Sequence, residues 1–269
     1  MIKQPIGVFD SGVGGLSVLS TLTHAFPNES FIYVGDTLRA PWGSRSVDEL
    51  HDIVFEIIAF LLKKDIKMLV IACNTSNSLF LEDVINQIKI PVQDLVLPTA
   101  LSLSPQALSA PIAVMATQNT VNTHSYQQAI HSISPNTTVH EIACPELVPL
   151  IETNRLGSSE ASLVAAQYTS KLIDLGCQTI IHGCTHYPFF ESLLSKENPK
   201  FKFINPANCI VSPLNQKLVT HSLKATVGPP NKWEGYVTKD VETFHSFINN
   251  FNLWELSDYQ LNYLNLTNI

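Results

Sequence analysis

The sequence predicts an α/β fold with two pseudo-symmetric α/β domains, mostly parallel sheets and a functional site in the cleft between the domains. Short apolar strands alternate with amphipathic helices along the chain, which is typical of parallel sheets. The strands are continuous apolar runs, as expected when helices cover both faces of a sheet. Residues 67–85 and 178–194 also align without gaps around Cys73 and Cys184, which indicates two similar halves.

The strands and helices follow from apolar runs and from helical periodicity. Strands are expected at residues 5–10, 31–36, 68–73, 90–95, 111–116, 137–143, 178–184 and 201–206. Helices are expected at residues 16–26, 46–64, 76–88, 98–108, 120–133 and 158–175, and after residue 206. Ser46 is the expected N-cap of the long amphipathic helix. Residues 235–251 predict a final strand followed by a helix.

The internal similarity also divides the chain into domains. We expect residues 1–96 together with 207–269 to form the first domain, and residues 97–206 to form the second. No long linker or low-complexity stretch separates these parts, so they should pack closely. Residues 254–269 are expected to cap a helix or to contact a second subunit.

The composition argues against several classes of function. The 269 residues are 45% hydrophobic, enough apolar material for one large core or two smaller ones. A net charge of -7 and only three scattered Arg residues give no general attraction to nucleic acid or to an anionic membrane. The N-terminus lacks the features of a signal peptide, and the longest apolar run is too short to span a bilayer. We therefore expect a cytoplasmic protein.

The five cysteines are expected to be reduced in that compartment. Their spacing contains no C-x-x-C and no His pair stands at zinc-ligand spacing, so no metal site is expected. Free cysteine is among the most buried residue types, and a single Cys at a strand end is more often structural than functional. We interpret Cys144, Cys177 and Cys209 as structural.

Three polar clusters, at residues 10–15, 73–78 and 183–188, follow the ends of expected strands. In open parallel sheets, ligands bind beyond the carboxyl ends of the strands. If the two halves face each other, Cys73 and Cys184 lie on opposite sides of one cleft. One thiolate can then remove a proton from a carbon atom while the other thiol donates a proton to the opposite face, which inverts the carbon.

A thiol suits this chemistry because its pKa of about 8.5 lets it act as acid and as base near neutral pH. Both cysteines directly precede an expected helix, whose N-terminus stabilises a thiolate. Asp10 and His186 are candidates to hold or pass on the proton. Asn74, Thr75, Thr185 and the amides of the Gly-rich turn after Asp10 can bind a carboxylated substrate.

Several longer motifs together resemble the cofactor-independent aspartate/glutamate racemase family, and within it the glutamate type. They are IGVFDSGVGGLSVL (6–19), YVGDTLRAPWG (33–43), VIACNT (70–75), CPELVPLIE (144–152) and GCTHYP (183–188). Residues 236–251 resemble the closing strand and helix of the family. The similarity covers nearly the whole chain.

The resemblance implies interconversion of L- and D-glutamate without pyridoxal phosphate or metal, which serves bacterial peptidoglycan synthesis. It implies Cys73 and Cys184 as the two acid/bases, assisted by Asp10, Glu152 and His186. The matching substrate-binding positions are Ser11, Pro41, Trp42, Gly43, Asn74, Thr75, Thr117, Thr120 and Thr185. Family members often form dimers, so a homodimer is the expected assembly.

Other interpretations stay open. The substrate could be another compound such as aspartate or a hydantoin, or the cleft could hold an acidic ligand without turning it over. The Gly-rich turn can be a turn alone, and His186 can simply anchor a loop. A pyridoxal-phosphate enzyme is disfavoured because no Lys lies in any of the motifs.

Two departures from the family pattern stand beside the motifs: Trp42 replaces a common Tyr, and His182 replaces a common Leu. Residues two apart on a strand share a face, so His182 and Cys184 are expected to point the same way. A charged His182 would then stabilise the Cys184 thiolate. The alternative is that His182 packs in a hydrogen-bonded pocket.

Overall fold

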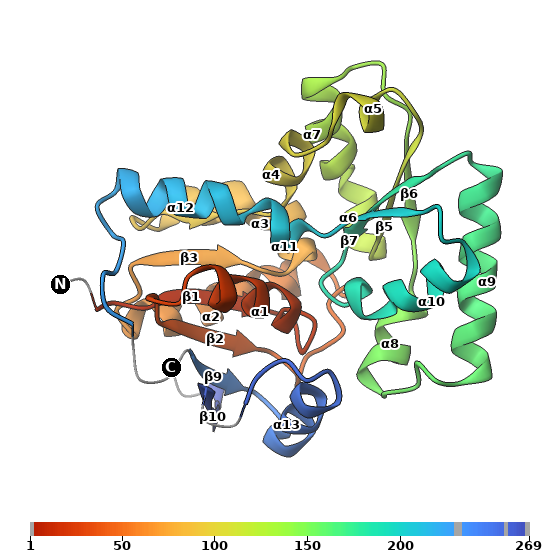
Figure 1. Ribbon diagram of the computed structural model, residues 1–269. Coiled ribbons are helices and arrows are strands. Elements are labelled where there is room, and N and C mark those ends of the chain that lie inside the picture. The colour runs from red at the N-terminus through yellow and green to blue at the C-terminus, as the bar shows by residue number, and fades with distance from the viewer. Residues whose placement is uncertain (1–2, 229–232, 256–257, 267–269) are drawn as a thin grey trace.

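The computed structural model describes residues 3–228, 233–255 and 258–266 (Figure 1). Within these residues the strands form two sheets in which every pair is parallel, which confirms the expected α/β fold. The first sheet runs in the order β10-β9-β2-β1-β3-β4 and the second in the order β6-β5-β7-β8.

The strands of the first sheet are β1 Ile6–Asp10, β2 Phe31–Gly35, β3 Met68–Ile71, β4 Val92–Gln93, β9 Trp233–Val237 and β10 Tyr259–Tyr263. The strands of the second sheet are β5 Ile112–Ala116, β6 Val139–Ala143, β7 Thr179–Gly183 and β8 Lys202–Ile204. The two sheets therefore draw on separate parts of the chain. We propose 1–96 with 207–269, and 97–206, as the bounds of two domains.

The order of the strands shows the pseudo-symmetry. The series β2-β1-β3-β4 in the first sheet has the same connectivity as β6-β5-β7-β8 in the second. In this correspondence β3 matches β7, and these are the strands that precede Cys73 and Cys184. The internal similarity of the sequence thus reflects two equivalent strand ends.

The helices lie between the strands in sequence and cover the sheets in space. They are α1 Leu16–Ala25, α2 Val47–Lys63, α3 Asn74–Gln87, α4 Val96–Leu101, α5 Pro105–Leu108, α6 Gln118–Thr123, α7 Ser125–Ile133, α8 Leu147–Glu152, α9 Ser159–Asp174, α10 Glu191–Glu197, α11 Pro206–Cys209, α12 Val211–Thr220 and α13 Val241–Asn250. A 3₁₀ turn, η1, occupies Tyr187–Phe190. None of the helices in the described part of the chain has both the length and the apolar character needed to cross a membrane.

Apolar residues on both faces of each sheet form the core. In the first sheet, α1, α12 and α13 pack on one face and α2 and α3 on the other. In the second sheet, α9 and α10 pack on one face and α4 and α7 on the other. Buried residues of α1 and α13 from the first half and of α9 from the second belong to one apolar cluster, so the two halves share a core. Figure 1 shows the resulting two lobes, with α4 and α11 in contact where the chain passes between them.

Several local predictions are confirmed and others need correction. Ser46 caps α2, since its Oγ accepts a hydrogen bond from the Glu49 N–H at 3.4 Å. The helix expected at 120–133 is broken at His124, whose φ of 53° ends α6 and starts α7. The helix expected at 98–108 is also two helices, because Ser104 and the proline after it begin α5 anew. Helix α8 was not expected.

The C-terminal segment extends the first sheet instead of capping a helix. Strand β10 pairs in parallel with β9, from Tyr259↔Trp233 to Tyr263↔Val237. Trp254 packs against Trp233 with ring centroids 4.9 Å apart. Its Nε1 donates to Thr23 Oγ1 at 3.1 Å. Residues 256–257 and 267–269 of this segment lie outside the described residues.

Candidate active site

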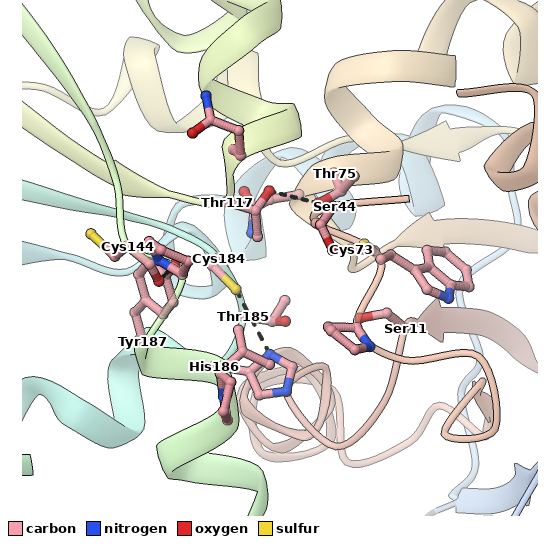
Figure 2. Close-up of a pocket in the computed structure, with 18 residues that line it drawn as sticks. Ser11, Ser44, Cys73, Thr75, Thr117, Cys144, Cys184, Thr185, His186 and Tyr187 are labelled. Carbon is pink, nitrogen blue, oxygen red and sulfur yellow. Dashed lines mark hydrogen bonds between the residues drawn. The ribbon is translucent and has the colours of Figure 1, made fainter. Parts of the chain in front are cut away.

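A cleft lies where the carboxyl ends of the two sheets face each other (Figure 2). The carboxyl ends of β1 and β3 supply one wall and those of β5 and β7 supply the other, so the site follows the rule for open parallel sheets. The residues that line it are Ser11, Pro41, Trp42, Gly43, Ser44, Cys73, Asn74, Thr75, Thr117, Gln118, Cys144, Pro145, Val148, Pro149, Cys184, Thr185, His186 and Tyr187.

Cys73 and Cys184 reach this cleft from opposite walls, as Figure 2 shows. Their exposed fractions are only 4% and 6%, so bulk water has little access to either thiol. Cys73 is the N-cap residue of α3. No helix begins directly after Cys184, contrary to the sequence prediction, because η1 starts at Tyr187 and α10 only at Glu191.

Burial and the nearby Asp10 charge raise the pKa of the Cys73 thiol to about 12, and the charge of Cys184 adds to this rise. Cys73 is therefore protonated at neutral pH. Cys184 has a different neighbour, since its Sγ lies 3.7 Å from His186 Nδ1. The two thiols thus occupy unlike electrostatic surroundings, one beside a carboxylate and one beside an imidazole.

His186 bridges Cys184 and Glu152. Its Nε2 lies 2.8 Å from Glu152 Oε1, while Nδ1 faces the sulfur. Burial alone would lower the pKa of His186, but its hydrogen bonds to Cys184 and Glu152 and their negative charges raise it well above 6.5. Burial would raise the pKa of Glu152, but the hydrogen bond and charge of His186 lower it. Glu152 does not line the cleft and reaches it through His186.

Asp10 is fully buried at the end of β1 and stands behind the cleft wall. Its Oδ2 accepts hydrogen bonds from the N–H groups of Gly12 at 3.2 Å and Gly15 at 2.8 Å. Thr185 Oγ1 donates to Oδ1 at 3.2 Å across the two halves. Burial raises the pKa of Asp10, and the His186 charge and these hydrogen bonds oppose the rise.

Some of the backbone amides of the Gly-rich turn, which the sequence suggested as anion-binding groups, already have partners within the protein. Asp10 occupies those of Gly12 and Gly15, and Glu152 accepts a hydrogen bond from that of Val13. Gly14 is required for a different reason: a Cβ there would stand 2.2 Å from His186 Nδ1. The turn therefore packs directly against the catalytic candidates of the other half.

Most of the expected substrate-binding residues line the cleft. These are Ser11, Pro41, Trp42, Gly43, Asn74, Thr75, Thr117 and Thr185. Thr120 does not line it and lies behind Thr117, with its Oγ1 3.1 Å from that of Thr117. Tyr126 holds Asn74 from the other half, because its hydroxyl donates to Asn74 Oδ1 at 2.5 Å. The amide nitrogen of Asn74 is then left for a ligand.

The sequence interpretation missed part of the wall. Ser44, Gln118, Cys144, Pro145, Val148, Pro149 and Tyr187 also line the cleft. Cys144 was interpreted as structural, yet it forms part of this surface. The motifs CPELVPLIE and GCTHYP contain five of these seven residues, so position within those motifs was the available signal.

His182 is buried in β7 but is not among the residues that line the cleft. Its ring stacks on Phe203 at 5.2 Å with an interplanar angle of 3°. Its Nε2 lies 2.9 Å from Glu191 Oε2. These contacts favour the packing interpretation over a direct role beside Cys184.

Comparison with known proteins agrees with this geometry. The family profile described as Asp/Glu/Hydantoin racemase matches residues 10–213. A glutamate racemase of Gloeothece citriformis is 39% identical over 229 residues, which cover 84% of this chain and 81% of that protein. The crystal structure of a glutamate racemase isoform from Bacillus anthracis superimposes with a TM-score of 0.90 at 30% identity, over 99% of each chain.

The crystal structure of glutamate racemase from Francisella tularensis in complex with D-glutamate matches with a TM-score of 0.88 at 30% identity, over the full length of both chains. The profile match, the identity to relatives of similar length and the shared fold agree with one another. The chain therefore belongs to the Asp/Glu/Hydantoin racemase family and, within it, to the glutamate racemases.

Proposed function

We propose that this protein interconverts L- and D-glutamate by a two-base mechanism in which Cys73 and Cys184 exchange protons with the α-carbon. The observation that supports it is that two thiols, from equivalent strand ends of two similar halves, line opposite walls of one cleft. A planar carbon between them is open to one thiol on each face. Inversion at that carbon follows from this arrangement.

In the proposed reaction, a thiolate takes the α-proton, so an S–H bond forms as the C–H bond breaks. The electron pair remains on the α-carbon and is shared with the α-carboxylate. The opposite thiol then gives its proton to the other face and becomes a thiolate. With its raised pKa, Cys73 is the proton donor in the resting protein. When Cys73 donates its proton, Cys184 beside His186 is the base that removes the α-proton. When the other enantiomer of glutamate is the substrate, the two cysteines exchange these roles.

Neutral donors suit the two carboxylates of glutamate. The described residues that line the cleft include no Lys or Arg, but they include Asn74, Thr75 and Thr185. Hydroxyl and amide groups can bind a carboxylate without adding a competing charge beside the thiols. The low exposure of both thiols also excludes water from the developing carbanion. A lysine for a pyridoxal-phosphate Schiff base is missing from the same set of lining residues.

The biological role that we propose is the supply of D-glutamate for peptidoglycan synthesis in the cytoplasm. Support comes from the resemblance of the motifs and from bacterial relatives named glutamate racemase. The bound D-glutamate in the Francisella tularensis structure supports the choice of substrate.

The first experiment is proton NMR of the purified protein with L-glutamate in D₂O, with chirality followed by circular dichroism. Loss of the α-proton signal together with loss of ellipticity is the expected result. Persistence of both signals contradicts the proposed substrate. The same assay with L-aspartate and other amino acids then identifies the alternative.

The two-base scheme predicts that Cys73→Ser and Cys184→Ser each abolish racemisation, because a serine hydroxyl is far too weak an acid to replace a thiol. The matched control is Cys209→Ser, since Cys209 is half-buried in α11 away from the cleft and should keep wild-type turnover. Circular dichroism of the mixture measures racemisation directly. Wild-type turnover in either of the first two variants contradicts the scheme.

A further inference from the structure

The loop from Asp36 to Arg45, between β2 and α2, forms one side of the cleft. Its tip supplies Pro41, Trp42, Gly43 and Ser44 to the lining. The shape of the substrate site therefore depends on where this tip stands, and irregular loops keep a defined position only when specific contacts hold them.

The base of the loop is fixed within the first half. Arg39 Nε donates to Asp36 Oδ2 at 2.7 Å, and Arg45 Nε donates to the Arg39 carbonyl at 2.6 Å. The other carboxylate oxygen of Asp36 accepts from Thr238 Oγ1, beyond β9, at 2.8 Å. These bonds hold the two ends of the loop but do not involve the carbonyl groups at its tip.

The tip is held by Asn119, a residue of α6 in the other half. Its side-chain Nδ2 donates to the carbonyl oxygens of Trp42 at 3.2 Å and Arg45 at 3.0 Å. Its backbone N–H donates to the Gly43 carbonyl at 3.1 Å. Asn119 thus binds two carbonyl groups of the tip and the carbonyl group of Arg45 across the cleft.

The same contact explains the glycine at position 43. A Cβ there would stand 2.7 Å from Cβ of Thr117, so the tip is pressed against the start of α6. Asn119 does not line the cleft, although its neighbours Thr117 and Gln118 do. Its side chain bonds to the loop. Asn119 can therefore affect the substrate only through the position of the loop.

We propose that Asn119 is a positioning residue that docks the loop tip across the cleft and thereby sets the affinity for substrate. The inference rests on the proposed glutamate racemase function. Because the acid/base residues stand on other elements, loss of this contact loosens substrate binding more than it slows proton transfer.

The test compares Asn119→Ala and Asn119→Asp with Asn136→Ala, an exposed residue of the same half that lies outside the cleft lining. Loss of two neutral hydrogen bonds predicts a KM for glutamate raised about 10-fold in Asn119→Ala, with kcat within about 2-fold. Asn119→Asp should raise KM further, because its carboxylate faces two carbonyl oxygens and cannot donate. Asn136→Ala should match the wild type.

Thermal unfolding of each variant separates positioning from folding. An unchanged KM in Asn119→Ala overturns the inference. If kcat and Tm also fall while KM stays at the wild-type value, the role of Asn119 is structural. The wild-type protein is assayed in parallel. If it does not racemise glutamate, the proposed function fails, whereas racemisation by the wild type and a wild-type KM in Asn119→Ala contradict only the role of Asn119.

Discussion

At the scale of single residues, the cleft contains two unlike proton-transfer groups. Cys73 stands near the buried carboxyl of Asp10, whereas Cys184 stands against His186, which Glu152 holds from behind. A reaction that needs one protonated and one deprotonated thiol can use such asymmetry, because burial and the Asp10 charge keep the Cys73 thiol protonated. Glu152 and Asp10 both act on the cleft from positions outside its lining.

The pair of His186 and Glu152 predicts a pH-dependent contribution to stability. His186 has a pKa above 6.5 in the folded protein, so its contribution is full below pH 6.5 and is lost as pH rises through the raised pKa. The pKa of Glu152 is lowered below 4.5, so its contribution is present above pH 4.5 and is lost as pH falls through the lowered pKa. The pair therefore stabilises the fold most between about pH 4.5 and pH 6.5.

Glu152→Gln should then lower the free energy of unfolding by about 1.5–3 kcal/mol between about pH 4.5 and pH 6.5, since a charged hydrogen bond becomes a neutral one. The loss should shrink toward both acid and alkaline pH. Urea unfolding across that range measures it. Glu160→Gln is the matched control, because its ion pair with Arg155 is exposed and should contribute little. A loss that is constant with pH contradicts the coupling.

At the scale of elements, the alternation of side chains along β7 predicted that His182 and Cys184 share a face, and the structure gives the two residues different surroundings. His182 lies in the strand, but its ring packs on Phe203 of β8 and bonds to Glu191 of α10. Cys184 follows the end of the strand, where the chain turns into the cleft. The period of two holds within a strand and stops where the strand stops, so residue 184 need not share the surroundings of residue 182.

His182→Leu should therefore leave the pH dependence of racemisation unchanged. The expected cost is in stability, because the hydrogen bond to Glu191 is lost. Superimposable pH–rate profiles of wild type and variant are the result that this packing predicts. A displaced limb in the profile of the variant would show that His182 acts electrostatically on Cys184.

Helix boundaries were the least predictable elements. His124 adopts a left-handed backbone that divides one expected helix, and Ser104 begins a new helix in the middle of another. Apolar periodicity continues through such breaks, since it records which face is buried and not whether the backbone is continuous. Helix α8 has only six residues, and its last residue, Glu152, reaches His186.

At the scale of the whole molecule, two similar halves place equivalent strand ends against each other. Polar contacts join the halves around the cleft, including Thr185 to Asp10 and Tyr126 to Asn74. The hydroxyls of Thr75 and Thr117 also lie 3.0 Å apart across it. The site therefore exists only when the halves are assembled.

The family resemblance further predicts a homodimer. Light scattering coupled to size-exclusion chromatography should then give twice the chain mass of 29.7 kDa. A mass that equals one chain at working concentration contradicts this prediction.

The amino-acid sequence was sufficient for the order of the strands through β9, for the equivalence of Cys73 and Cys184, and for most of the cleft. Those features depend on local patterns and on motifs: alternating apolar runs, turn residues and a repeated strand–Cys segment. Contacts between distant residues carry no comparable local signal. The docking of the loop tip by Asn119 follows only from the packing of one half against the other, and the link from Glu152 to His186 only from packing within the second half.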